Sequence, residues 1–289
     1  MRAVVVGAGS WGTAFARVLA DAGHEVAVFG RERTDADFTG AELVCVAVPS
    51  RSFADVARSL PGDAPVLILT KGLDPATGAR LSTLVRGRPV AALSGPNHAE
   101  EIGAGLPAAA VVASEDEPLA ARLRDALASP RFRVYANPDL VGVELCAAAK
   151  NVIALAAGAA DGLEAGDNAK AALVTRGLAE MARLGNAFGA RTETFAGLAG
   201  MGDLVVTCWS RHSRNRRAGE LVARGASADE AESTIGMTVE GLVTAPTLAR
   251  LAGDAGVELP ITEAVCAWLR GASVTQLVAN LMRREPTEE

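Results

Sequence analysis

Residues 4–12 read VVVGAGSWG, an apolar run followed directly by three glycines with the spacing G-x-G-x-x-G. Helical sequence follows, and a second apolar run covers Glu25–Phe29. In a strand–turn–helix unit, Gly7 permits the tight turn, Gly9 lets the backbone approach a ligand, and Gly12 lets the helix pack on the strand. Because free N–H groups at a helix start bind phosphate, this unit predicts a site for the pyrophosphate of a dinucleotide.

The end of the second apolar run bears on which dinucleotide binds. An acidic residue is expected there to hold a ribose 2′-hydroxyl, but the chain reads FGRER at 29–33. An arginine such as Arg31 can neutralise a 2′-phosphate, so the sequence favours NADP, or use of both NAD and NADP, over strict NAD. The alternative is that these arginines are solvated loop residues.

Short apolar runs alternate with helical stretches through the first half of the chain. The runs are continuously apolar rather than alternating, which is typical of parallel strands covered on both faces. This pattern predicts an α/β fold with a Rossmann-like doubly wound sheet. The expected strands are Ala3–Val6, Glu25–Phe29, Leu43–Val48, Val66–Leu69, Val90–Leu93 and Ala108–Ala113.

The strand signal stops after about Pro138, and the remaining sequence is typical of helices. Residues Leu140–Ala160 are apolar almost all round, which predicts a buried helix. We therefore expect a dinucleotide-binding Rossmann-like domain at 1–138, followed by an all-α, substrate-binding domain at 139–289.

Composition excludes several classes of protein. The 289 residues are 49% hydrophobic, enough for a sizeable core, and the net charge of −6 argues against a nucleic-acid binder. The chain shows no signal peptide and no apolar run of about 20 residues free of Gly or charge, so we expect a cytoplasmic protein without an integral membrane segment. The cysteines are far apart and predict buried, reduced thiols and no metal site: Cys45, Cys146, Cys208 and Cys266.

Two loops follow expected strands at the edge of the sheet where ligands bind in open α/β folds. The sequence TKG (70–72) places Lys71 there, beside the expected nicotinamide end of the cofactor. The loop SGPNHA (94–99) is rigidified by Gly and Pro, so its backbone can approach a ligand. A surface lysine and a plain turn are the alternatives, and His98 alone is no evidence of a catalytic base.

Lys150 is the most informative single residue, because its helix otherwise consists mainly of Ala, Val, Leu and Ile. An unpaired buried ammonium is expensive, so it needs an acidic partner, a ligand or a lowered pKa. A desolvated lysine can serve as a general base; a snorkelling lysine or a buried ion pair is the alternative. The glycine-dense stretch GLAGMGDL (197–204) delivers Asp203, which could orient Lys150 or cap a helix.

The stretch SRNRR (213–217) concentrates three arginines within four residues of an acidic protein. Guanidinium groups match phosphate oxygens, and Ser213 and Asn215 add neutral donors. The stretch therefore predicts a phosphate-bearing partner, with a solvated helix face as the alternative.

Together these motifs resemble the bacterial NAD(P)-dependent glycerol-3-phosphate dehydrogenases. The motifs occur in the order of that family and cover nearly the whole chain. The matching stretches are GAGSWGTA (7–14), AVPS (47–50), TKGL (70–73), SGPNHAEE (94–101), ELCAAAKNV (144–152), GLAGMGDL (197–204), SRNRRAG (213–219) and VEG (239–241).

The resemblance implies that sn-glycerol 3-phosphate and dihydroxyacetone phosphate interconvert by hydride transfer at nicotinamide C4, feeding phospholipid synthesis. It implies Lys150 as the general base, with Asp203 and Lys71 in the catalytic group and Thr207 in support. The implied substrate contacts are Lys71, Gly95, Asn97, Lys150, Asp203, Ser213, Arg214 and Asn215. The implied dinucleotide contacts, beyond the three glycines, are Ser10, Trp11, Arg31, Lys71, Ala99, Arg214 and Glu240.

One departure from the family leaves the choice of NAD or NADP open. Only 13 residues separate Phe29 from Leu43, where family members carry a longer segment with a helix and another strand. Two alternatives remain: a non-catalytic dinucleotide sensor, and a β-hydroxyacid dehydrogenase. The latter enzymes place Lys and Asn a helical turn apart, whereas Lys150 and Asn151 are adjacent. The apolar helices of the second half suggest a homodimer.

Overall fold

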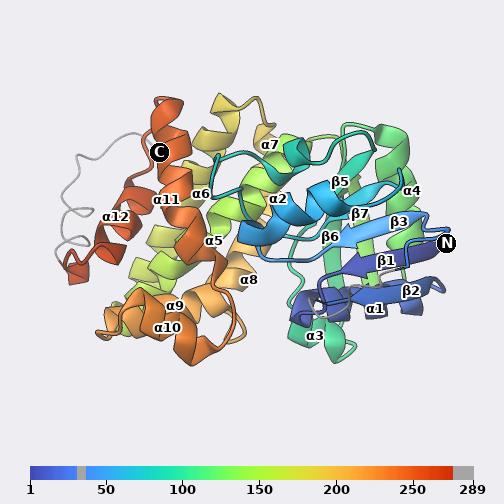
Figure 1. Cartoon of the computed structure of the whole chain (residues 1–289). Coiled ribbons are helices and arrows are strands. Elements are labelled where there is room, and N and C mark those ends of the chain that lie inside the picture. Colours follow the sequence, from blue (N-terminus) through green and yellow to red (C-terminus); the bar gives the residue numbers. More distant parts are fainter. Residues whose placement is uncertain (31–36, 276–289) are drawn as a thin grey trace.

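The computed structural model describes residues 1–30 and 37–275. A strand-rich first half and a helical second half lie side by side (Figure 1). The elements of the first half are β1 (Arg2–Val6), α1 (Ser10–Asp21), β2 (Glu25–Phe29), β3 (Leu43–Val46), α2 (Ser50–Ser59), β4 (Val66–Ile68), η1 (Leu81–Leu84), β5 (Val90–Ser94), α3 (Ala99–Gly103), β6 (Ala108–Ala113), α4 (Glu117–Leu127) and β7 (Phe132–Asn137).

The first half is one sheet with the strand order β2-β1-β3-β4-β5-β6-β7. The Rossmann-like arrangement expected from the sequence is confirmed, and five strands from β2 to β5 run parallel. One pair departs from the parallel pairing that the apolar runs favoured, because β6 runs antiparallel to β5. The apolar run at β6 shows that both faces of the strand are covered, and a strand can be covered in this way whether it pairs in a parallel or an antiparallel direction.

Strand β7 was not among the expected strands. It pairs with β6 at the edge of the sheet, and its residues alternate between buried Phe132 and Val134 and exposed Arg133 and Tyr135. Only one of its faces is covered, so it lacks the continuous apolar run that marks the interior strands.

Side chains from the strands form two apolar layers, one on each face of the sheet. On β3, Leu43 and Cys45 enter the layer covered by α1 and α4, whereas Val44 and Val46 enter the layer covered by α2 and η1. The interior strands are therefore buried on both faces, and the carboxyl ends of the five parallel strands β1 to β5 emerge together at the edge nearest the helical half (Figure 1).

Helix α5 (Leu140–Gly162) is the centre of the second half. It is buried along nearly its whole length and packs against α6, α8, α9, α11 and α12. By length and mean hydropathy it could span a bilayer, but 89% of its most apolar window is buried inside the protein. The other elements are α6 (Gly166–Ala187), α7 (Thr192–Ala196), η2 (Leu198–Gly202), α8 (Asp203–Trp209), α9 (Arg214–Ala223), α10 (Ala228–Ile235), α11 (Glu240–Asp254) and α12 (Pro260–Leu269).

Glycines bring α9 into backbone contact with α5. A Cβ atom on Gly219 would lie 2.0 Å from the carbonyl oxygen of Leu155, and one on Gly158 would lie 1.9 Å from that of Arg216. No larger side chain fits at either position without moving a helix. This close packing fixes where the first residues of α9 lie.

The connection from β2 to β3 is short, with 13 residues between Phe29 and Leu43. Its described residues form no further strand or helix. It leads from the carboxyl end of β2, past β1, to the amino end of β3. Phe38 stacks on Phe29 with ring centroids 5.9 Å apart, and Asp37 pairs with Arg2 at 2.9 Å. Among the described residues, β2 pairs with β1 alone and therefore forms the outer edge of the sheet.

Candidate active site

A cavity of about 350 Å³ lies between the carboxyl ends of the strands and the helical half. Its walls come from the glycine loop, the loops after β3, β4 and β5, helix α5 and the segment around Ser213. The site thus combines segments that are far apart in the sequence and belong to both halves of the chain.

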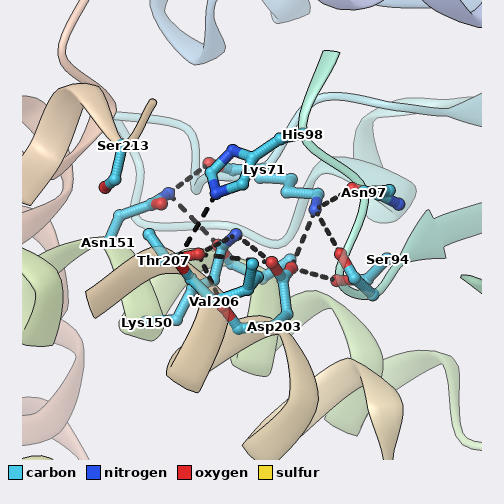
Figure 2. Close-up of polar contacts among 12 residues, drawn as sticks. Lys71, Ser94, Asn97, His98, Lys150, Asn151, Asp203, Val206, Thr207 and Ser213 are labelled. Atoms are coloured by element: carbon cyan, nitrogen blue, oxygen red, sulfur yellow. Dashed lines mark hydrogen bonds and ion pairs between the residues drawn. The ribbon is translucent and has the colours of Figure 1, made fainter. Parts of the chain in front are cut away.

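Lys150 lies in the middle of α5 and reaches the cavity floor (Figure 2). Its ammonium donates to a carboxylate oxygen of Asp203 and, at 2.9 Å, to the hydroxyl of Thr207. Burial lowers the pKa of Lys150 to about 7, although the charge of Asp203 acts in the opposite direction. The structure therefore supplies both the acidic partner and the lowered pKa that the sequence suggested.

Asp203 joins two lysines from opposite halves of the chain. Its other carboxylate oxygen accepts from Lys71 at 2.7 Å and from the Ser94 hydroxyl at 3.1 Å. Burial alone would raise the pKa of Asp203, but Lys150 and Lys71 together hold it at about 2. While Lys150 is protonated, two ammonium groups and one carboxylate give this buried cluster a net positive charge, which favours an anionic ligand.

Lys71 follows strand β4 and is held on several sides. Besides Asp203, its ammonium donates to the Asn97 side chain at 2.7 Å and to the Gly95 carbonyl at 3.1 Å. Its own carbonyl accepts from the Asn151 side chain at 2.9 Å. The loops after β4 and β5 are therefore fixed to each other and to α5.

The glycine loop has the shape that its sequence predicts. Gly7 has φ +114°, and a Cβ atom there would lie 2.4 Å from the Ala47 carbonyl oxygen. A Cβ atom on Gly12 would meet the Gly7 carbonyl at 1.8 Å, whereas nothing lies within 4 Å of one on Gly9. Helix α1 starts after Gly9 without a side-chain cap, so no side chain accepts from the N–H groups of its first turn. Gly9, Ser10 and Trp11 at this helix start line the cavity. This open, donor-rich helix start fits a pyrophosphate.

The sequence suggested that the three arginines after Ser213 form one phosphate-binding cluster, but the structure separates them. Arg214 lines the cavity and donates to the Thr238 carbonyl at 2.9 Å. Arg216 instead pairs with Asp161 of α5 at 2.5 Å, and Arg217 is exposed. Helical spacing explains the difference, because successive residues of α9 point in different directions. One guanidinium therefore faces the site.

A chain of amides links the elements around the cavity. Asn215 donates to Asn151 at 2.9 Å and accepts from the Gly241 N–H at 2.8 Å. At the start of α11, beside Gly241, the carboxylate of Glu240 accepts from the hydroxyl of Ser50 at 2.6 Å and from the backbone N–H of Ser50 at 3.0 Å. These bonds connect α5, α9 and α11 and tie α11 to the start of α2.

Most of the described residues predicted for the site line the cavity. Those in the lining are Gly9, Ser10, Trp11, Lys71, Asn97, Ala99, Lys150, Ser213, Arg214, Asn215 and Glu240. Those outside the lining are Gly7, Gly12, Gly95 and Asp203. Asp203 is 1% exposed and lies behind the two lysines. Arg31 lies outside the described residues.

Sequence reasoning did not single out Ser94, Ser50 or the bond from Asn151 to the Lys71 carbonyl. Ser94 ends strand β5, and Ser50 opens α2 just beyond β3. Polar residues directly after buried strands were the available signal for both. Asn151 offered no such signal, because its partner comes from a distant loop.

Comparison with known families and proteins identifies the relatives of this arrangement. The model of the NAD-dependent glycerol-3-phosphate dehydrogenase C-terminus matches residues 139–279. The model of the N-terminus of the same family matches residues 2–38 and 34–120. The chain belongs to the NAD-dependent glycerol-3-phosphate dehydrogenase family. The match to the N-terminal model divides at 34–38, within the short connection from β2 to β3.

Individual members of the glycerol-3-phosphate dehydrogenase family agree over the full length. The glycerol-3-phosphate dehydrogenase [NAD(P)+] of Moorella thermoacetica is 44% identical, covering 99% of this chain and 96% of its own length. The crystal structure of glycerol-3-phosphate dehydrogenase from Coxiella burnetii superposes with a TM-score of 0.93 at 36% identity, covering 98% of this chain and 99% of the other. A ketopantoate reductase from Ralstonia eutropha, at 18% identity and a TM-score of 0.58, shares the fold alone.

Proposed function

We propose that the protein is an NAD(P)-dependent oxidoreductase that interconverts sn-glycerol 3-phosphate and dihydroxyacetone phosphate. The observation that carries the proposal is the buried Lys150–Asp203–Lys71 cluster, positioned in a cavity that begins at the glycine loop. Family membership specifies the substrate class, and the net positive cluster suits a phosphorylated compound.

Lys150 manages the proton of the reacting hydroxyl. With a pKa of about 7, its amine is available in both protonation states near neutral pH. In the direction of oxidation, the neutral amine takes the proton of the C2 hydroxyl; in reduction, the ammonium returns it. Thr207 and Asp203 hold the nitrogen in place while its charge changes.

Lys71, Gly95, Asn97, Ser213, Arg214 and Asn215 are the proposed substrate contacts, together with Lys150 and Asp203. Arg214 and the hydroxyl of Ser213 line the cavity where α9 begins, so we assign the phosphate to this end. Lys71 then stands near the carbon chain, beside the carboxylate of Asp203. The substrate thereby spans the junction of the two halves.

The glycine loop fits the pyrophosphate of the cofactor, because Gly9 leaves space and the start of α1 offers N–H donors. When bound, NAD or NADP supplies the hydride acceptor and NADH or NADPH the hydride. Ser10, Trp11, Ala99, Arg214, Glu240 and Lys71 are the proposed contacts to the dinucleotide. We assign residues 1–138 to the dinucleotide-binding domain and 139–289 to the substrate-binding domain.

The test is oxidation of NADH and of NADPH by the purified protein with dihydroxyacetone phosphate. We expect turnover with at least one of the two cofactors, and none with dihydroxyacetone, which lacks the phosphate. Absence of turnover at saturating levels of both cofactors would overturn the proposal. Binding of a dinucleotide without turnover of any phosphorylated or free hydroxy compound would instead indicate a sensor.

Three further proposals concern the cellular location, the metabolic role and the oligomeric state of the protein. We propose that the protein works in the cytoplasm, that its glycerol phosphate feeds phospholipid synthesis, and that the chain forms a homodimer. Light scattering at several protein concentrations tests the last point, and a monomer at the highest concentration would contradict it.

A further inference from the structure

The lining of the cavity around Lys150 is rich in hydrogen-bond donors. Lys71 and Lys150 carry ammonium groups, Arg214 a guanidinium and Ser213 a hydroxyl. Glycerol phosphate and dihydroxyacetone phosphate each carry, besides the reacting C2 group and the phosphate, a free hydroxyl at C1. A hydroxyl taken out of water needs an acceptor as well as donors, or it loses a hydrogen bond.

Most acceptors near the two lysines are already engaged. The carboxylate of Asp203 accepts from both lysines, and the Asn97 side-chain oxygen accepts from Lys71. The Asn151 oxygen accepts from Asn215, and that of Asn215 from a backbone N–H. The carboxylate of Glu240 accepts twice from Ser50, and Glu100, which also lines the cavity, is exposed.

His98 offers an acceptor that lies close to both lysines. Its Nε2 lies 3.4 Å from the Val206 carbonyl oxygen, which accepts only, so Nε2 carries the hydrogen of the neutral ring. The other ring nitrogen, Nδ1, then has a lone pair and has no hydrogen-bonding partner among residues 1–30 and 37–275. Figure 2 shows the ring of His98 above Lys150, between Lys71 and Ser213.

The charged groups that face His98 favour this neutral form. Burial lowers its pKa from the ordinary value, and the ammonium groups of Lys150 and Lys71 lower it further, against the opposing effects of the hydrogen bond to the Val206 carbonyl and of Asp203. His212, whose ring centroid lies 6.2 Å away, adds a second imidazole from the segment before α9. Near neutral pH, Nδ1 is therefore an acceptor.

We propose that His98 is a specificity-determining residue whose Nδ1 accepts the hydrogen bond of the free C1 hydroxyl of the substrate. The inference rests on the proposed function and extends it, since it says how the site selects a compound with that hydroxyl. A substrate without the hydroxyl leaves Nδ1 unpaired in a desolvated site, and a site without Nδ1 leaves the hydroxyl unpaired.

The test compares dihydroxyacetone phosphate with hydroxyacetone phosphate, the same compound without the C1 hydroxyl. For the wild type we expect kcat/KM to be roughly ten- to hundredfold higher with dihydroxyacetone phosphate, the effect of one unmade hydrogen bond. In His98→Leu that ratio should fall to near one, chiefly through loss of activity on the hydroxylated compound. In His98→Asn, whose side-chain oxygen takes the place of Nδ1, a large part of the ratio should return.

The pH dependence of the same ratio provides a readout that a structural role would not move. Protonation of His98 turns Nδ1 into a donor, and its pKa lies below the ordinary His value of about 6.5. The wild-type ratio should therefore be constant down to about pH 6.5 and fall only at more acidic pH. The ratio in His98→Asn should not change with pH. Titration of the phosphate cancels, because both substrates carry it, and His24→Asn, far from the site, should behave as the wild type.

A ratio unchanged in His98→Leu, or a ratio in His98→Asn no higher than in His98→Leu, would overturn the inference. These outcomes leave the proposed function intact, because turnover of dihydroxyacetone phosphate by the wild type is measured in the same experiment. A wild type that turns over neither compound would overturn the proposed function, and the inference with it.

Discussion

Lys150 combines burial with a single carboxylate partner, and that partner is shared with Lys71. Replacing Lys150 by Ala removes the proton acceptor but no group that contacts the glycine loop. We expect kcat to fall by about 10²–10⁴-fold, the usual contribution of a general base, while NADH affinity stays within a factor of about three. Steady-state kinetics and fluorescence titration measure the two effects.

The matched control is Lys170→Met. Lys170 is also a buried lysine of the helical half, but it pairs with Asp161 and lies outside the cavity lining. We expect it to lose stability and keep kcat. If Lys150→Ala folds and retains a near-normal kcat, Lys150 is not the base.

The pKa of Lys150, about 7, sets the pH dependence of oxidation. The base acts when neutral, so kcat/KM for glycerol phosphate should rise with pH and level off above about pH 7. In Asp203→Asn the carboxylate that raises the pKa of Lys150 is gone, so the inflection should move to lower pH. An inflection that stays in place would mean that it belongs to the phosphate of the substrate.

Arg214 and Arg217 provide a matched pair at the phosphate end, since only Arg214 faces the cavity. Arg214→Ala should raise KM for dihydroxyacetone phosphate by roughly ten- to a hundredfold, because a charge-assisted bond contributes about 1.5–3 kcal/mol. Arg217→Ala, three residues further along α9, should leave KM unchanged. Equal effects of the two substitutions would contradict the assignment of the phosphate site.

Much of this residue-scale picture could be predicted from the sequence. Lys150 was conspicuous because a charge in an apolar helix demands a partner, and Lys71 because it follows a buried strand. The sharing of Asp203 by both lysines was not predictable, because it depends on how the two halves meet. The same limit applied to Arg216, whose partner Asp161 lies on another helix.

At the scale of elements, the contact between α5 and α9 is the most sensitive to substitution. Gly219→Ala would place a methyl group 2.0 Å from the Leu155 carbonyl oxygen, so α9 must move away from α5. We expect a loss of about 1–3 kcal/mol in the free energy of unfolding, together with a higher KM for the phosphorylated substrate. Urea denaturation and steady-state kinetics measure these effects.

Gly253→Ala in α11 is the control, because nothing lies within 4 Å of its added Cβ atom. Helix propensity then predicts a stability gain of up to about 1 kcal/mol and no change in KM. Similar losses in both variants would show that the effect of Gly219→Ala is not one of packing.

Element positions were predictable where the signal was local. The interior strands followed from continuous apolar runs, and α5 from its all-round apolar surface. The direction of β6 was not predictable in this way, because apolar runs look alike in parallel and antiparallel pairs. Strand β7 was missed because an edge strand alternates between exposed and buried residues.

At the scale of the whole molecule, all four cysteines are buried and unpaired: Cys45, Cys146, Cys208 and Cys266. This agrees with the expectation of reduced, buried thiols. Burial raises the pKa of each thiol, so little reactive thiolate forms at neutral pH. We expect no reaction with Ellman's reagent in the native state and four equivalents after unfolding in denaturant. Rapid labelling of a cysteine in the native protein would contradict this expectation, because it would show that the packing around that thiol opens readily.

The position of β2 at the outer edge of the sheet determines what a longer β2–β3 connection would disturb. The alignment with the Moorella relative runs over 323 positions against 289 residues here, so at least 34 positions (323 less 289) have no counterpart in this chain. One interruption of the family match falls between β2 and β3. A strand added there would lie outside β2 and break none of the existing strand pairs. The sheet can therefore differ in length at this margin while the strand ends that position the residues around Lys150 stay paired as they are.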